Sequence, residues 1–253
     1  MIQQLPWRPI HQTILLVVLV VFAASCSRVP RDVSDPGVVR HETLAPESFP
    51  LEWYQAKQSL PGSRIYKIDP GRSLLKIKVY RDGRLAKYGH NHIVSSNNIN
   101  GLIYIDKVFS KSRIDSYISV NSLIVDDPVL RAEAGEDFSA HVTEQAITGT
   151  RTNMLSERVL NIRQYPYLFL SAVPKNTDKE YPELITSITI RDNRQTLIHS
   201  PKLKIDGEEL SASGVFTIRQ TGFGIEPFSV MLGALRVKDE LTIEYQIKAN
   251  SIK

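Results

Sequence analysis

The chain has 253 residues, of which 42% are hydrophobic and 23% are charged, so it can bury one sizeable core or at most two small ones. Its net charge of +4 comes from lysines and arginines that are spread along the sequence without a long basic block, and this pattern argues against a nucleic-acid-binding protein. Cys26 is the only cysteine, which excludes a fold held together by disulfides within the chain.

The N-terminal segment predicts export. An unbroken apolar run over residues 14–24 follows Arg8 and His11; it is too short to span a bilayer comfortably but suits the core of a signal peptide. Small residues then lead to Cys26, as in the bacterial lipobox, where the cysteine is lipidated and becomes the first mature residue. We therefore predict a signal peptide at 1–25 and lipid attachment at Cys26. The alternative is a signal peptide cleaved nearby, with Cys26 incidental.

Residues 26–61 are polar, contain several prolines and show no sustained periodicity. They predict a lipid-anchored linker. Trp53 and Tyr54 are expected to dock onto the folded domain, because an exposed tryptophan is unfavourable. Ser27 after the cysteine resembles the outer-membrane sorting pattern, so the expected location is the periplasmic side of the bacterial envelope.

Residues 62–253 predict a domain rich in β-strands. Apolar residues alternate with polar ones at Leu75-Ile77-Val79, Ile114-Ser116-Ile118-Val120, Ile188-Ile190 and Leu241-Ile243-Tyr245-Ile247. This period of two is typical of strands with one buried face. Turn pairs at Asp82-Gly83, Asp192-Asn193 and Asp206-Gly207 favour tight hairpins and hence antiparallel pairing.

The alternation disappears between Asp126 and Tyr165, where apolar residues are spaced by four. We predict one or two short helices here, with Thr152 or Asn153 as a cap, ending before Pro166. About eight strands with one helical insertion predict an all-β barrel or sandwich. Because the inward positions are almost all apolar, an open interior would accept a hydrophobic ligand.

Several segments in order resemble the YceI-like family of bacterial secreted proteins: Tyr66-Lys67-Ile68-Asp69, Gln164-Tyr165-Pro166-Tyr167-Leu168-Phe169-Leu170-Ser171, and Gly214-Val215-Phe216-Thr217-Ile218-Arg219-Gln220-Thr221-Gly222-Phe223-Gly224-Ile225. The resemblance covers residues 64–247. It implies an extended, lipocalin-like antiparallel β-barrel that holds a long isoprenoid chain, in proteins that are typically periplasmic and not enzymes. Two features depart from the family: the segment around His90 and His92, and a longer helical insertion at 131–151.

His90 and His92 lie on the same side of an extended backbone. Three roles are open for the pair: sharing a metal ion, contacting the polar head of a ligand, or bracing a strand end by hydrogen bonds. A closed metal site needs further ligands, and the spacing of His141 and His199 does not indicate that they converge on the pair.

Other candidates are Arg219, which could pair with a polar head or be a surface charge, and Phe223 and Phe228, which could line a cavity or be ordinary core residues. The sequence has no nucleophile elbow and no recognisable triad, so we predict neither an enzyme nor a cofactor.

The predicted function is non-enzymatic binding or carriage of an isoprenoid or quinone-type lipid. One alternative is a metal- or redox-linked accessory protein that uses His90 and His92. Another is a structural envelope protein with a packed barrel. Besides the lipid, the expected partner is the membrane, through the acyl anchor; no nucleic acid is expected, and a homodimer is left open.

Overall fold

The computed structural model describes residues 45–252. The predicted signal peptide, Cys26 and much of the predicted linker lie outside these residues. Within the described part, no helix combines the length and the apolar character needed to cross a membrane.

Twelve antiparallel strands form the main sheet, in the order β10-β9-β8-β6-β5-β1-β15-β2-β4-β7, with β12 paired to β15 and β11 to β12. Their bounds are β1 (Arg64–Ile68), β2 (Leu74–Val79), β4 (His92–Ser96), β5 (Ile99–Ile105), β6 (Arg113–Ser119), β7 (Ile124–Val125), β8 (Tyr167–Pro174), β9 (Leu184–Ile190), β10 (Asn193–His199), β11 (Lys202–Asp206), β12 (Glu209–Arg219) and β15 (Glu240–Ile252).

Strand β15 is the centre of this sheet. One of its edges pairs with β12 over the whole length of β12, from Glu209 opposite Asn250 to Arg219 opposite Glu240. Its other edge carries β2 and then β1, one after the other. A single long strand therefore joins both halves of the sheet.

The antiparallel, mainly β fold is confirmed, but the expectation of a closed barrel of about eight strands is wrong. Within residues 45–252 no ladder joins β10 to β12 or to β7. β12 pairs with β15 along its whole length and with β11 over residues 209–213, and the rest of that second edge, residues 214–219, pairs with no strand of the described part. β10 therefore ends one side of the sheet unpaired. The extra strands include β7, which is too short to leave an alternating pattern in the sequence.

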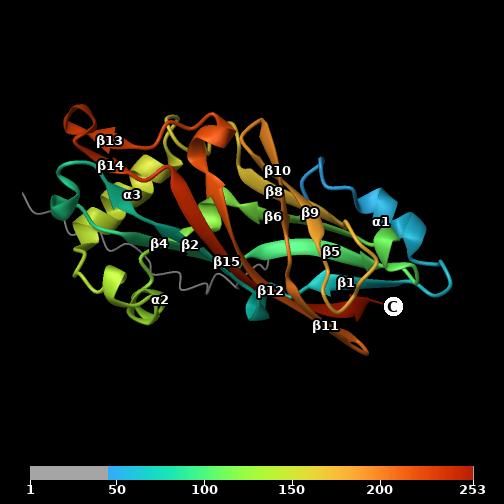
Figure 1. The fold of residues 1–253 in the computed structure, drawn as a ribbon. Helices are drawn as coiled ribbons and strands as arrows, with labels where there is room; N and C mark the ends of the chain where they lie inside the picture. The colour runs from blue at the N-terminus through green and yellow to red at the C-terminus, as the bar shows by residue number, and fades with distance from the viewer. Residues whose placement is uncertain (1–44, 253) are drawn as a thin grey trace, which may run out of the picture. The chain divides into compact units, whose positions relative to one another are not determined.

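The sheet curls so that its two halves face each other. In Figure 1 the orange and red strands β12 and β15 cross in front of the green strands β5 and β6. Residues of all four strands line one cavity, among them Ile103, Ile118, Phe216 and Ile243. The alternating residues of the sequence thus form the inner face, as their period of two predicts.

A small second sheet covers one end of the curl. It consists of β3 (Arg81–Asp82), β13 (Ser229–Val230) and β14 (Leu235–Val237), in the order β13-β14-β3. We call residues 81–89 and 228–238, which form this sheet and its connections, the cap. Gly83 holds the two parts of the cap together at close range: its φ is +96°, and a Cβ there would lie 2.4 Å from the carbonyl oxygen of Ala234.

The predicted helical insertion is confirmed, but the predicted capping residues are wrong. It contains α2 (Pro128–Glu133) and α3 (Glu144–Leu155). Thr143 caps α3, because its extended backbone lets its hydroxyl accept from the Ala146 N–H at 3.3 Å. Thr152 and Asn153 lie instead in the last turn of that helix.

Part of the segment predicted as linker packs against the sheet. Helix α1 (Leu51–Lys57) buries Tyr54, whose hydroxyl donates to Asp115 Oδ2 at 2.8 Å. Trp53 packs edge-on against Tyr104, and Phe49 is buried with the same cluster. The expected docking of Trp53 and Tyr54 is therefore observed, and the packed structure begins before residue 62.

Candidate functional site

The curled sheet encloses an apolar cavity, which we call the apolar chamber, with a volume of about 180 Å³. Side chains from most of the sheet line it, and nearly all are aliphatic or aromatic: examples are Leu75, Ile103, Ile188, Leu203, Phe216 and Ile247. The exceptions in this wall are Ser112, Arg113, Ser116, Thr186, His199 and Tyr245. A cavity with so apolar a wall favours apolar groups over water.

A second cavity of about 280 Å³ lies beneath the cap. We call it the histidine chamber, because His90 and His92 both line it. It shares four wall residues with the apolar chamber, namely Ile77, Leu168, Ile190 and Ile218. The two chambers are thus neighbours, and the histidine chamber has the more polar wall.

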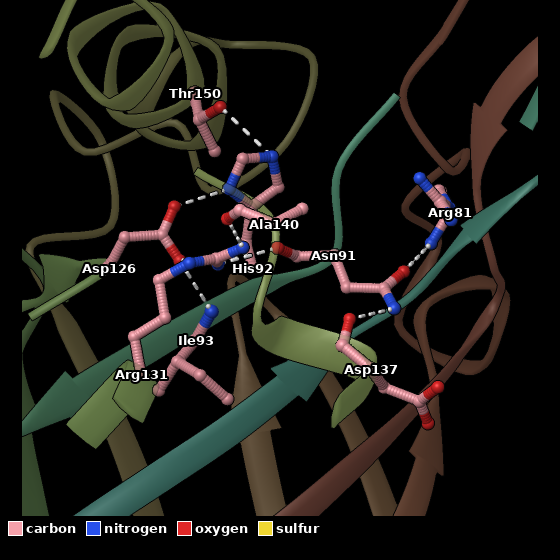
Figure 2. A network of polar contacts seen from close by, with 9 residues as sticks. All are labelled: Arg81, Asn91, His92, Ile93, Asp126, Arg131, Asp137, Ala140 and Thr150. Atoms are coloured by element: carbon pink, nitrogen blue, oxygen red, sulfur yellow. Dashed lines mark hydrogen bonds and ion pairs between the residues drawn. The ribbon is translucent and has the colours of Figure 1, made fainter. Parts of the chain in front are cut away.

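His92 is fixed by a buried carboxylate (Figure 2). Its Nδ1 donates to Asp126 Oδ2 at 2.6 Å, while its Nε2 lies 3.4 Å from the Thr150 hydroxyl of α3. Asp126 Oδ1 accepts from the backbone N–H of Ile93 at 2.9 Å. Both ring nitrogens are therefore oriented by neighbours, which sets the position of the imidazole.

Arg131 of α2 completes this network, which we call the latch. Its Nη1 donates to Asp126 Oδ1 and to the Asn91 carbonyl oxygen, both at 2.7 Å, and its Nη2 donates to the Ala140 carbonyl oxygen at 3.0 Å. Burial acts to raise the pKa of Asp126, but the hydrogen bonds from His92 and Ile93 and the charge of Arg131 outweigh it and lower that pKa. Asp126 is thus a carboxylate in the folded protein.

The Asn91 side chain joins the latch to the cap. Its Oδ1 accepts from the backbone N–H of Arg81 at 3.0 Å, and its Nδ2 donates to the Asp137 carbonyl oxygen at 2.8 Å. Every residue from Asn91 to Ile93 is consequently held by a contact from another element. His90, directly before this stretch, is the residue whose side chain lacks such a contact within the described part of the chain.

His90 faces the chamber without such partners. Among residues 45–252 its imidazole makes no hydrogen bond, and its ring lies 6.4 Å from the ring of His92, measured between centroids. Burial first, then the neighbouring His92, Arg131 and Arg81, lower its pKa, so the neutral ring predominates at pH 7. A neutral imidazole offers one donor and one acceptor to a ligand.

The alternative of a metal site at His90 and His92 finds no third ligand among the described residues. No group of three or more His, Cys, Asp and Glu side chains between residues 45 and 252 is placed to hold a metal ion. His141 is exposed, and His199 lies in the apolar chamber. A metal shared by His90 and His92 would therefore need ligands from solvent or from a bound molecule.

A polar cluster around His199 was not predicted from the sequence. His199 Nε2 lies 2.8 Å from the Tyr245 hydroxyl and its Nδ1 lies 3.3 Å from the Thr186 hydroxyl. The three residues come from β10, β15 and β9, so only the fold brings them together. Gly214 makes room for this cluster, because a Cβ there would lie 2.7 Å from the Tyr245 hydroxyl oxygen. Alternation does mark Tyr245 as an inward residue.

The buried His199 predicts a loss of stability in mild acid. Burial lowers its pKa from the usual 6.5, so the fold favours the neutral ring, and this stabilisation is complete above pH 6.5 and is lost as the pH falls toward the lowered pKa. We expect the free energy of unfolding, measured by urea titration, to fall between pH 7.5 and 5. His199→Gln should flatten this slope and His141→Gln should not; equal slopes in all three proteins would contradict the assignment.

Of the other predicted site residues, Phe223 and Phe228 line the histidine chamber, and Phe223 is buried. Arg158 stacks over the Phe228 ring at 5.2 Å. Arg219 does not line either chamber; it is exposed, whereas its neighbours Ile218 and Gln220 face the histidine chamber. Strand alternation turns Arg219 outward, so it matches the alternative of a surface charge.

The fold resembles those of solved bacterial proteins. BcnA from Burkholderia cenocepacia aligns over 72% of this chain and 99% of its own, with a TM-score of 0.54 and 12% identity. A YceI protein from Campylobacter jejuni aligns over 61% of this chain and 82% of its own, with a TM-score of 0.44 and 12% identity. The predicted structural resemblance to YceI proteins is confirmed; at this identity the likeness concerns the fold alone. No protein-family model and no curated protein matches the chain.

Proposed function

We propose that this protein binds a long amphiphile, an isoprenoid or a quinone-type lipid, and carries it in the bacterial cell envelope without chemical change. The observation that carries the proposal is the pair of adjoining chambers, one almost wholly apolar and the other lined by His90 and His92. The BcnA-like fold supports the architecture. The anchor at Cys26 and a periplasmic, outer-membrane location complete the proposal.

The size of the chambers favours a long ligand. Each has less than the roughly 300–1,000 Å³ of a common small-molecule pocket, at about 180 and 280 Å³. A ligand that fills both would place its tail in the apolar chamber, past Ile77 and Leu168, and its head beside His90. Burial of the tail supplies most of the affinity, at about 0.8 kcal/mol for each methylene group.

The head group is expected to be neutral and able to hydrogen-bond. His90 presents an unengaged imidazole, and Arg81, Thr150 and Gln220 also line the histidine chamber. A phenol, a quinone carbonyl or an alcohol would match these groups. The chambers do not suit the alternative of a structural protein with a packed interior, because such a protein has no cavity to fill.

The direct test is lipid analysis of the protein purified from its own host without delipidation. We expect about one polyisoprenoid-containing molecule per chain in the extract, identified by mass spectrometry. If the extract contains no such lipid, and the purified protein takes up no added isoprenoid, the proposal fails.

Substitution of His90 tests the placement of the head. We expect His90→Ala to weaken binding of a polyprenyl phenol or quinone by about tenfold, the usual value of one lost hydrogen bond, and to leave binding of a polyisoprene hydrocarbon unchanged. His141→Ala is the matched control, because His141 is exposed and lies outside both chambers. If His90→Ala weakens the binding of both ligands equally, His90 shapes the wall of the chamber and does not contact the head group. Fluorescence titration measures both affinities.

A further inference from the structure

We propose that the cap is a docking surface for an anionic lipid bilayer, which brings the histidine chamber to the membrane from which the ligand is taken. The proposal rests on the proposed function for its purpose. Its evidence is separate, because it comes from the outer surface of the cap and not from the cavity walls.

The cap ends in an exposed apolar tip. Met231 is 68% exposed and Leu232 is fully exposed, and the preceding Val230 is also exposed. Tyr88, on the neighbouring turn η2 (Ala86–Tyr88), is 68% exposed. The two turns are joined through the Leu85 N–H, which donates to the Ala234 carbonyl oxygen at 2.8 Å. Consecutive large apolar side chains at a loop tip have no folding purpose and are typical of a contact surface.

The backbone of this tip is unusual for its residues. Met231 and Leu232 have φ angles of +51° and +55°, in the left-handed region that bulky side chains rarely adopt. Glycine or asparagine would fit such a turn at lower cost. The tip therefore carries large apolar side chains at two positions where the backbone favours glycine or asparagine. This indicates that the apolar side chains have a function of their own.

The cap that carries this tip is rich in basic residues. The cap contains five of them, Arg81, Arg84, Lys87, Arg236 and Lys238, and a single acidic residue, Asp82, which pairs with Arg236 at 2.8 Å. All five basic residues are exposed. Positive charge around an apolar tip complements anionic head groups above an acyl layer, because the charges meet the head groups as the apolar side chains enter the boundary.

The cap is also the outer wall of the histidine chamber. Arg81, Val230 and Arg236 line that chamber and are also exposed at the surface, so these residues separate the chamber from solvent. A ligand that is insoluble in water has to come from a membrane. A bilayer in contact with the tip would therefore lie against the outer wall of the histidine chamber.

The test measures penetration of the tip in the full chain without ligand. Leu232→Trp and Ile198→Trp each add one tryptophan at an exposed apolar position, the second on β10 outside the cap. The native Trp53, and Trp7 where the predicted signal peptide is retained, give the same background in both variants. On vesicles of brominated phosphatidylcholine and phosphatidylglycerol, we expect the added fluorescence to be mostly lost at position 232 and retained at 198. Equal quenching at both positions, or quenching that persists undiminished without phosphatidylglycerol, would overturn the proposal.

A second variant connects docking to transfer. Met231→Asn and Leu232→Asn together fit the positive φ angles and remove the apolar tip, so the fold should be retained. We expect transfer of a polyprenyl quinone from phosphatidylcholine–phosphatidylglycerol vesicles to slow by roughly tenfold or more, because the lost side chains no longer enter the bilayer. The same quinone added from ethanol should bind as before. Unchanged transfer would overturn docking. If the parent chain does not bind the quinone added from ethanol, the proposed function is contradicted. Docking is still tested in that case, because the quenching measurement uses no ligand.

Discussion

Replacement of Asp126 by alanine is expected to lower the free energy of unfolding by about 3–5 kcal/mol, the usual cost of leaving a buried charge without its partner. The Asp126 side chain is fully buried and that of Arg131 is 10% exposed. Without the carboxylate, Arg131 loses its counter-charge, His92 loses the acceptor for Nδ1, and the Ile93 N–H loses its acceptor. Urea titration at pH 7 measures the change.

Two matched variants separate charge from backbone geometry. Asp126 has a φ of +54°, which asparagine also tolerates, so Asp126→Asn keeps the turn and the Ile93 contact and should cost less than Asp126→Ala. Asp127→Ala removes only the N-cap of α2 and should cost about 1 kcal/mol. A loss below about 1 kcal/mol for Asp126→Ala would mean that the latch does not stabilise the fold.

The latch also explains what the sequence could and could not predict about the site. The prominence of His90 and His92 was visible in the chain, and so was the possibility that one of them braces a strand end. The partner of His92 lies 34 residues away, in a segment with no pattern that pairs it with β4. A contact between two side chains this far apart in the sequence is set by the fold, and local periodicity does not predict it.

The cavity walls were predictable to a greater degree. A strand with one apolar face has to turn that face inward, and Leu75, Ile77, Ile243 and Tyr245 do so. Alternation alone does not decide whether the inner face is packed or hollow, or whether the outermost strands meet. Those properties depend on strand register and on the edge of β12 that β11 occupies, and neither leaves a local sequence pattern.

Substitution of Ile218 is expected to have a large effect on ligand affinity, because its side chain lines both chambers. Ile218→Trp should narrow the junction and weaken binding of a long isoprenoid by at least about 100-fold. Such a loss corresponds to about 2.8 kcal/mol, and exclusion of about four methylene-sized groups from the apolar chamber is sufficient at about 0.8 kcal/mol each. A ligand short enough for the histidine chamber alone should bind nearly as before.

Val215→Trp is the matched control, since Val215 lies on the same strand and faces solvent. Thermal unfolding of both variants shows whether the larger side chain is accommodated; in a hollow interior the cost should stay below the roughly 1–3 kcal/mol of overpacking a filled core. The informative measurement is the affinity of the parent and the variants for isoprenoids of increasing length. If the affinity of the parent rises with length and that of Ile218→Trp levels off at short chains, the two chambers act as one site. If Ile218→Trp binds long ligands as tightly as the parent, the tail does not pass the junction, and the ligand lies in a single chamber.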